Sequence, residues 1–124
     1  MVVNQSRILL DTNIALYYLG GRLTTPLPKG QYYISIITEM ELLSYPSLSP
    51  TEEQQIQNFL SQLLIVNINN SIKKMAISLR KQYRLKLPDA IIAATAQSLQ
   101  AILLTNDNRI CNIGSLITQS MPIT

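Results

Sequence analysis

Four acidic residues stand at positions where their carboxylates could act together: Asp11, Glu41, Asp89 and Asp107. Asp11 and Asp107 each follow a short apolar run that is a predicted strand, and Asp89 and Glu41 each fall in the first turn of a predicted helix. In an open parallel sheet, the ends of the strands and the starts of the helices meet at the edge where such folds bind ligands. The spacing therefore predicts an acidic site at that edge.

Each of these acids also suits an ordinary structural role. Asp11 is placed to cap the helix after it, and Glu41 completes a capping box with Thr38. Asp89 suits the positive end of a helix dipole, and Asp107 is a common turn residue. Four acids that converge on one edge, however, repel one another unless a cation lies among them. Oxygen ligands without histidine or cysteine select Mg²⁺ or Mn²⁺, so a divalent cation is predicted here.

The composition excludes several other chemistries. The 124-residue chain has no histidine and a single cysteine, Cys111, so serine–histidine catalysis, a structural zinc site and a disulfide framework are all ruled out. Hydrophobic residues make up 47% of the chain, which is too many for a disordered protein and enough for one compact domain. The formal net charge of +3 is a weak indication of an anionic partner.

Short apolar runs alternate with helical patterns along the chain, which predicts a parallel sheet with helices on both faces. The predicted strands are Arg7–Leu10, Tyr32–Ile37, Leu64–Ile68, Ala101–Leu104 and Leu116–Thr118. The predicted helices are Asn13–Leu19, Thr38–Tyr45, a helix from Pro50 with apolar residues up to Leu64, Ile72–Tyr83 and Pro88–Gln100. Before the helix from Pro50, Ser49 is the predicted N-cap and forms a capping box with Glu52. A loop is expected over Gly20–Gly30, and no second domain boundary is found, so residues 1–124 are expected to form one α/β domain.

Four segments resemble the sequence motifs of the PIN domain family. They are Ile8–Leu19 (ILLDTNIALYYL), Ile34–Leu43 (ISIITEMELL), Leu87–Ala96 (LPDAIIAATA) and Leu103–Asp107 (LLTND). The resemblance covers nearly the whole chain in order and spacing. It places the acids of the family on Asp11, Asp89 and Asp107, and on Glu41 rather than Glu39.

The resemblance implies a metal-dependent ribonuclease of the kind found in VapC-type toxins of bacterial toxin–antitoxin pairs. Asp11 and Asp89 would then be the principal ligands of Mg²⁺ or Mn²⁺, and Glu41 and Asp107 would complete the site. The remaining expected site residues, which would hydrogen-bond these carboxylates or the scissile phosphate, are Asn13, Thr105 and Asn106. The family also implies cleavage that leaves a 5′-phosphate and a 3′-hydroxyl, an antitoxin partner and a homodimer.

One departure from the family pattern lies just after Asp107. Where the family often has a further Asp and an aromatic residue, this chain has Asn108-Arg109-Ile110, so an acid is lost and a cation is gained. The choice between one and two metal ions is therefore open.

Basic residues gather just before the third motif. Six of the ten lysines and arginines fall between Lys73 and Lys86, and no acid occurs from Gln54 to Pro88. Helical spacing places Lys73, Arg80 and Arg84 along one flank of the predicted helix. We expect this flank to contact RNA phosphates, with a solvated helix face as the alternative.

Two other functions compete with the ribonuclease. A non-catalytic PIN-like module would bind RNA or a protein without cutting, although all four acid positions are filled. A phospho-acceptor signalling domain is also α/β with acids at strand ends, but it needs a lysine near the end of the chain, and none follows Lys86. Metal-dependent RNA cleavage distinguishes the ribonuclease from the non-catalytic module, and labelling with acetyl phosphate tests for the phospho-acceptor domain.

The sequence predicts no membrane segment and no export signal. The longest uncharged stretches, Gln54–Ile72 and Ala90–Asn106, are interrupted by Gln, Asn and Ser. Residues Met1–Arg7 lack the basic head and apolar run of a signal peptide. Together with a free thiol, these features predict a cytoplasmic protein.

Overall fold

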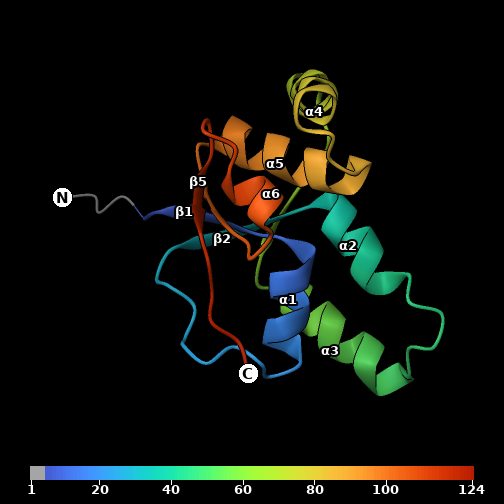
Figure 1. Cartoon of the computed structure of the whole chain (residues 1–124). Coiled ribbons are helices and arrows are strands. Elements are labelled where there is room, and N and C mark those ends of the chain that lie inside the picture. The colour runs from blue at the N-terminus through green and yellow to red at the C-terminus, as the bar shows by residue number, and fades with distance from the viewer. Residues whose placement is uncertain (1–4) are drawn as a thin grey trace.

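The computed structural model describes residues 5–124 and builds them around a five-stranded parallel sheet (Figure 1). The strands lie in the order β3-β2-β1-β4-β5, and every neighbouring pair is parallel. Their bounds are β1 Arg7–Leu10, β2 Gln31–Ser35, β3 Leu64–Val66, β4 Ile102–Leu104 and β5 Ile117–Gln119. The predicted α/β class with one parallel sheet is confirmed.

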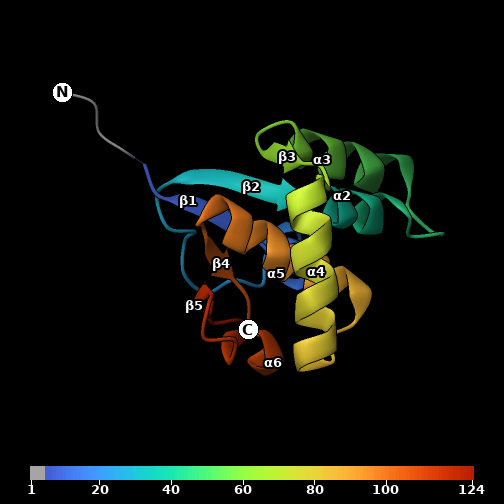
Figure 2. The same ribbon diagram turned by 90° about the horizontal axis from the view of Figure 1, so that it is seen from above.

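Helices cover both faces of this sheet, as the sequence predicts. They are α1 Thr12–Leu19, α2 Ile36–Leu43, α3 Pro50–Leu60, α4 Asn70–Tyr83, α5 Leu87–Leu99 and α6 Asn108–Cys111. Helices α1 and α3 lie on one side of the sheet and α5 on the other, and α4 crosses over α5 from outside (Figures 1 and 2). None of the helices in the described part of the chain is long and apolar enough to cross a membrane.

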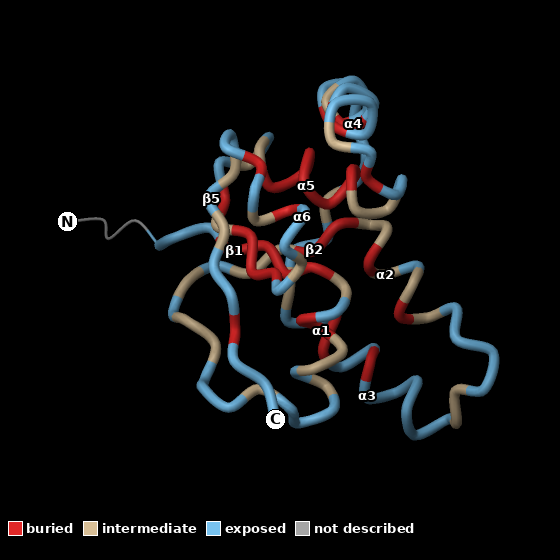
Figure 3. Tube along the Cα trace, in the orientation of Figure 1, coloured by how far each residue is buried: buried red, intermediate tan, exposed pale blue. Residues whose placement is uncertain are grey.

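The strands separate two hydrophobic cores because their side chains alternate between the faces. In β1, Ile8 and Leu10 pack with α1, α2 and α3, whereas Leu9 packs with α4 and α5. All three side chains are almost completely buried, as the red centre of Figure 3 shows. A strand buried on both faces reads as a continuous apolar run, which explains why RILL was recognisable as a strand.

Helix α5 is the element most deeply enclosed. Its residues Ala90–Ala96 are all buried, because the sheet lies against one side and α4 against the other. Its alanines are small enough to let both neighbours approach closely. The helix therefore holds its first turn, which carries Asp89, in a fixed position at the edge of the sheet.

The start of α2 differs from the prediction. The strand β2 ends at Ser35, and the side chain of Ser35 caps the helix by accepting a hydrogen bond from the N–H of Ile37. Thr38 is therefore inside the first turn, the predicted capping box with Glu41 is wrong, and Glu41 falls in the second turn. Serine and threonine both suit a helix cap, and the apolar residues on either side of Ser35 (ISII, residues 34–37) continue the strand pattern into the helix, so the sequence did not reveal the boundary.

Two further boundaries differ near the ends of elements. Helix α3 begins with the predicted capping box of Ser49 and Glu52 but ends at Leu60, before the last apolar residues of the predicted helix, and β3 starts at Leu64 as predicted but ends at Val66. Helix α6 is absent from the predicted elements. At four residues it is too short to leave a periodic pattern, and it begins directly after Asp107.

Candidate active site

The order of the strands brings two of the predicted acids together. β1 lies between β2 and β4. The chain goes from β1 to β2 and β3 on one side and later to β4 and β5 on the other, so the strand order reverses between β1 and β4. The carboxyl ends of these two strands flank that reversal point. Ligands of open α/β sheets bind in the crevice at such a point. Asp11 follows β1 there, and Asp107 follows β4.

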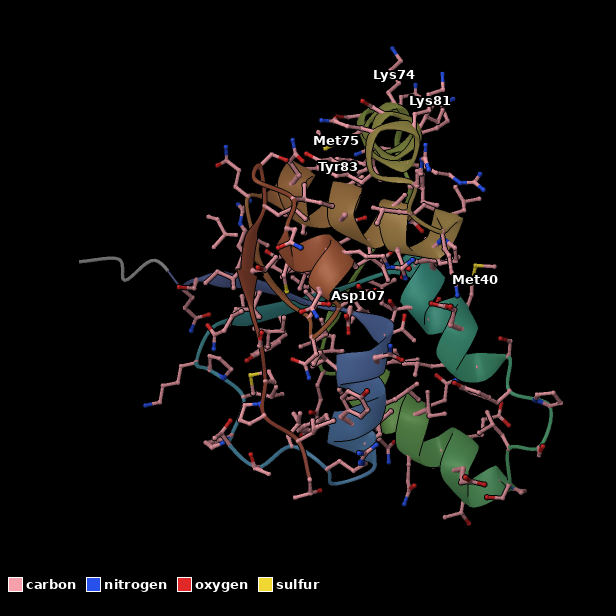
Figure 4. The ribbon with its side chains drawn as sticks, viewed as in Figure 1. Met40, Lys74, Met75, Lys81, Tyr83 and Asp107 are labelled. Carbon is pink, nitrogen blue, oxygen red and sulfur yellow. The ribbon has the colours of Figure 1, made fainter. Side chains whose placement is uncertain are left out.

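A cleft of about 280 Å³ lies at this edge, and all four predicted acids line it: Asp11, Glu41, Asp89 and Asp107. Figure 4 shows Asp107 between α6 and the start of α1. Three larger cavities, of about 440, 400 and 320 Å³, contain none of these four acids, and among their lining residues the only acid is Glu52. The cleft is therefore where carboxylates gather.

Asp11 combines a structural role with its place in the cleft. It is the N-cap of α1, and its Oδ1 accepts a hydrogen bond of 2.7 Å from the N–H of Ile14. Burial raises the pKa of its carboxyl, and the charges of Asp89 and Asp107 raise it further, while the Thr105 hydroxyl and the Ile14 N–H act in the opposite direction. The cap and the Thr105 hydroxyl together hold the carboxylate of Asp11 in one orientation in the cleft.

Asp89 is the acid with the fewest protein partners. Within residues 5–124, no hydrogen-bond donor or ion-pair partner is found for its carboxylate. Burial raises the pKa of Asp89, and the nearby charges of Asp107 and Glu41 raise it too, whereas Arg109 and Lys86 lower it. Both of its oxygens are free to bind a cation, and binding one would relieve the repulsion.

Glu41 is held from another helix by Thr12. The hydroxyl of Thr12 donates a hydrogen bond of 2.7 Å to Oε1 of Glu41, and it lies 3.0 Å from the hydroxyl of the buried Thr38. Glu39 is not among the residues that line the cleft. Sequence reasoning missed Thr12, although it lies between two predicted site residues, because only the fold places α1 beside α2.

Asp107 is already engaged by Arg109. Its Oδ1 accepts a hydrogen bond of 2.9 Å from the backbone N–H of Arg109, and its Oδ2 lies 3.5 Å from a guanidinium nitrogen of the same residue. Arg109 also lines the cleft, as does Lys86. Neither cation was predicted as a site residue, although the sequence signals one of them as a departure from the family pattern.

The three supporting residues lie in different surroundings. Asn13 is exposed and lines the cleft. Thr105 is completely buried beside Asp11, and its hydroxyl accepts a hydrogen bond from the N–H of Asp107. Asn106 is turned away from the carboxylates, because both ends of its amide bind the backbone of Met121, at 2.8 Å each. Asn106 therefore tethers the C-terminal segment.

The predicted basic flank lies on α4, outside the cleft. Lys73, Arg80 and Arg84 are all exposed, and none of them lines the cleft. Figure 4 shows Lys74 and Lys81 on the outer side of α4, with Met75 and Tyr83 on another side. Arg80 donates a hydrogen bond of 3.3 Å to the carbonyl of Leu85 and so reaches the turn that carries Lys86 into the cleft.

The donor set of the cleft fits a hard divalent cation. Its acidic groups are all carboxylates, and no histidine or cysteine competes for a softer metal. Among residues 5–124, no three such side chains stand close enough to form a ready-made metal cluster. Mg²⁺ keeps several waters and is commonly held by one or two carboxylates, so Asp11 and Asp89, with Glu41 nearby, fit its requirements.

Comparisons with known proteins agree with this geometry. A family model described as "PIN domain" matches residues 8–116. The structure is similar to a toxin–antitoxin complex from Klebsiella pneumoniae, with 36% identity over 90% of this chain and 96% of that chain and a TM-score of 0.75. No match was found among curated proteins.

Two further solved structures are similar. VapBC-1 from nontypeable Haemophilus influenzae is 26% identical over 92% of this chain and 97% of that chain, with a TM-score of 0.73. VapBC2 from Rickettsia felis, bound to a DNA fragment from its promoter, is 22% identical over 94% of this chain and 99% of that chain, with a TM-score of 0.79, and shows likeness of fold alone.

Proposed function

The chain belongs to the PIN domain family, and from that premise we propose that it is a Mg²⁺- or Mn²⁺-dependent ribonuclease and the toxin of a VapBC-type pair. Its fold is that of the VapC-like toxins. The observation that carries the proposal is the cleft at the reversal point of the sheet, where four carboxylates from separate parts of the chain meet.

Hydrolysis of a phosphodiester needs an activated water and a counter-charge for the phosphate. When bound, a divalent cation supplies Lewis-acid activation of water and neutralises phosphate charge. Asp11 and Asp89 would hold it, and Glu41 would bind it directly or through water. Thr12 keeps Glu41 turned into the cleft, and the cap on Ile14 keeps Asp11 in one orientation. Asn13 is exposed at the rim, where its amide can bind a substrate phosphate.

RNA is the proposed substrate, and the flank of α4 is the proposed approach. Lys73, Arg80 and Arg84 are exposed, and no acid lies between Gln54 and Pro88 to neutralise them. Phosphate contacts of this kind give affinity without sequence preference. The bond from Arg80 to the turn before Lys86 makes the basic surface continuous with the cleft.

An antitoxin is the proposed protein partner. Several of the similar structures are described as toxin–antitoxin complexes. In this chain, a partly apolar groove of about 400 Å³ between α1 and α3 shares Leu16 and Tyr45 with the acidic cleft. A peptide seated in that groove would therefore reach the carboxylates. A homodimer is proposed on the family resemblance alone, and light scattering of the purified chain tests it.

The decisive test is cleavage of a generic single-stranded RNA with Mg²⁺ or Mn²⁺. We expect cuts that leave a 5′-phosphate and a 3′-hydroxyl, and we expect EDTA to abolish them. RNA binding without cleavage at any metal concentration would favour the alternative, a non-catalytic PIN-like module that binds RNA or protein.

A further inference from the structure

Two cations stand inside a cleft that is otherwise acidic. Lys86 is the N-cap residue of α5, and Arg109 lies in α6, so they come from different elements that flank Asp89. Both line the same cleft as Asp89, so their charges lie near its carboxylate. In the described part of the chain, the only ion pair is between Arg109 and Asp107. Lys86 therefore faces the cleft without an ion-pair partner there.

Asp107 has little capacity left for a metal ion. One of its oxygens accepts the backbone N–H of Arg109, and the other lies beside the guanidinium. Asp89 has no hydrogen-bond donor among residues 5–124, Glu41 accepts one hydrogen bond from Thr12, and Asp11 accepts one from the N–H of Ile14 beside the Thr105 hydroxyl. All three carboxylates therefore keep lone pairs for a cation. The carboxylates best able to bind a metal ion are therefore Asp11, Glu41 and Asp89, none of which belongs to α6 or is its N-cap.

The charge of the cleft matches one divalent cation. With its four carboxylates ionised and both cations present, the cleft has a formal charge of −2. One Mg²⁺ or Mn²⁺ balances that charge, whereas a second would meet Lys86 and Arg109 at close range. Repulsion between like charges in a partly enclosed site is weakly screened, so it opposes a second metal strongly.

We propose that the cleft binds a single divalent cation, and that Arg109 and Lys86 bind the scissile phosphate in the place of a second metal ion. This inference rests on the proposed ribonuclease function. In two-metal sites the two ions together stabilise the charge on the attacking and leaving oxygens of the phosphate. A guanidinium, which can donate two parallel hydrogen bonds to a phosphate, and an ammonium can supply that stabilisation without needing carboxylate ligands.

Arg109 is well placed for this role because it is anchored but not buried. Its side chain is 56% exposed, and its contact with Asp107 is a long one at 3.5 Å. Exposed pairs of this kind contribute little stability and allow the guanidinium to reorient, and it has five N–H donors, so it can bind a phosphate while it stays beside Asp107. Asp107 then serves to keep Arg109 at the cleft, in addition to its role as the N-cap of α6.

The first experiment counts bound Mn²⁺ by equilibrium dialysis, with circular dichroism to verify the fold of each variant. We expect one ion per wild-type chain, none in Asp89→Asn, and two in Arg109→Asp, which removes the cation and adds an acid. Two ions in the wild type, or still only one in Arg109→Asp, would overturn the inference.

The second experiment measures RNA cleavage and Mn²⁺ affinity in the same variants. Arg109→Gln should lower kcat on the order of 100-fold, as removal of a donor to developing charge does in other enzymes, and Lys86→Gln should lower it less. Both should bind Mn²⁺ as tightly as the wild type or more tightly, because a like charge is removed. Lys74→Gln, which removes one charge from the outer side of α4, is the matched control and should change neither quantity.

The two results separate the inference from the function on which it rests. A wild-type rate in Arg109→Gln, or weaker Mn²⁺ binding, would overturn the role of the two cations while leaving the ribonuclease proposal in place. A chain that binds one Mn²⁺ through Asp89 but cuts no RNA would overturn the proposed function and support only the metal count.

Discussion

The acidic cleft and the basic flank of α4 are two charged regions that differ in surroundings. The cleft brings acids and cations together beside the ends of β1 and β4, and two of its carboxyls have raised pKa values. The flank, formed by Lys73, Arg80 and Arg84, is exposed and has one sign of charge. Partial burial makes the charges of the cleft act on one another, whereas water screens those of the flank. Charge in the first region can do chemistry, and in the second it can only attract.

The largest expected effect separates these two regions directly. Asp89→Asn removes the carboxylate that has no hydrogen-bond donor in the described part of the chain. Loss of a residue that only supports a metal ligand can reduce activity by roughly 100-fold, so loss of Asp89, a proposed ligand, should reduce RNA cleavage by more. The fold should persist, because the amide keeps the size of the side chain. Cleavage rates at saturating RNA test this, and a wild-type rate would remove Asp89 from the site.

A second pair of variants asks whether position in the cleft, rather than charge alone, decides activity. Glu41 lines the cleft and Glu39 does not, although they are two residues apart in α2. Residues at that spacing are about 200° apart around a helix. Glu41→Gln should therefore lose most of the activity and Glu39→Gln little, and the opposite order would show that the second motif is aligned in the wrong register.

The basic flank should affect binding far more than catalysis. Replacing Lys73, Arg80 and Arg84 with Gln should weaken RNA binding and reduce its dependence on salt by roughly one unit of slope per lost phosphate contact. Cleavage at saturating RNA should change much less, because none of the three lines the cleft. Binding titrations at several salt concentrations measure the slope, and an unchanged slope would assign the flank to an ordinary solvated face.

Metal binding should raise the thermal stability of the protein, and this effect should depend on residues of the cleft but not on those of the flank. Mn²⁺ at a hundred times its Kd should stabilise the fold by about 2.7 kcal/mol, because it binds only the folded state. The rise in Tm should shrink in Asp11→Asn and persist in the triple variant of α4. Thermal unfolding with and without metal measures both, and no rise at millimolar metal would argue against a metal site.

The smallest expected effect is a pH dependence of metal-free stability. The folded state raises the pKa values of Asp11 and Asp89, so it binds their protons more tightly than the unfolded chain does. As the pH rises above the ordinary pKa of 3.8, these two carboxyls lose their protons in the unfolded chain first, and the free energy of unfolding falls. The loss of stability persists at neutral pH, where both carboxyls are ionised. Asp89→Asn should have nearly the wild-type Tm near pH 4 and a higher Tm at pH 7, and a constant difference would contradict the raised pKa.

Local patterns in the sequence were sufficient for much of the fold. Continuous apolar runs identified β1 and β4, because a strand buried on both faces needs apolar residues at every position. Helical spacing identified α4, and the Ser49 capping box identified the start of α3. The four acids were likewise found from their positions after predicted strands and in predicted helices.

The sequence by itself thus determined most of the elements, the parallel sheet and the four acids, but not helix α6 or the start of α2. Only the tertiary structure decided which groups surround those acids: the bond from Thr12 to Glu41, the attachment of Asn106 to Met121, and the place of Arg109 and Lys86 in the cleft. The physical reason is range. Capping and periodicity act over a few residues and are written in the local sequence, whereas hydrogen bonds and charges between elements depend on how distant segments pack.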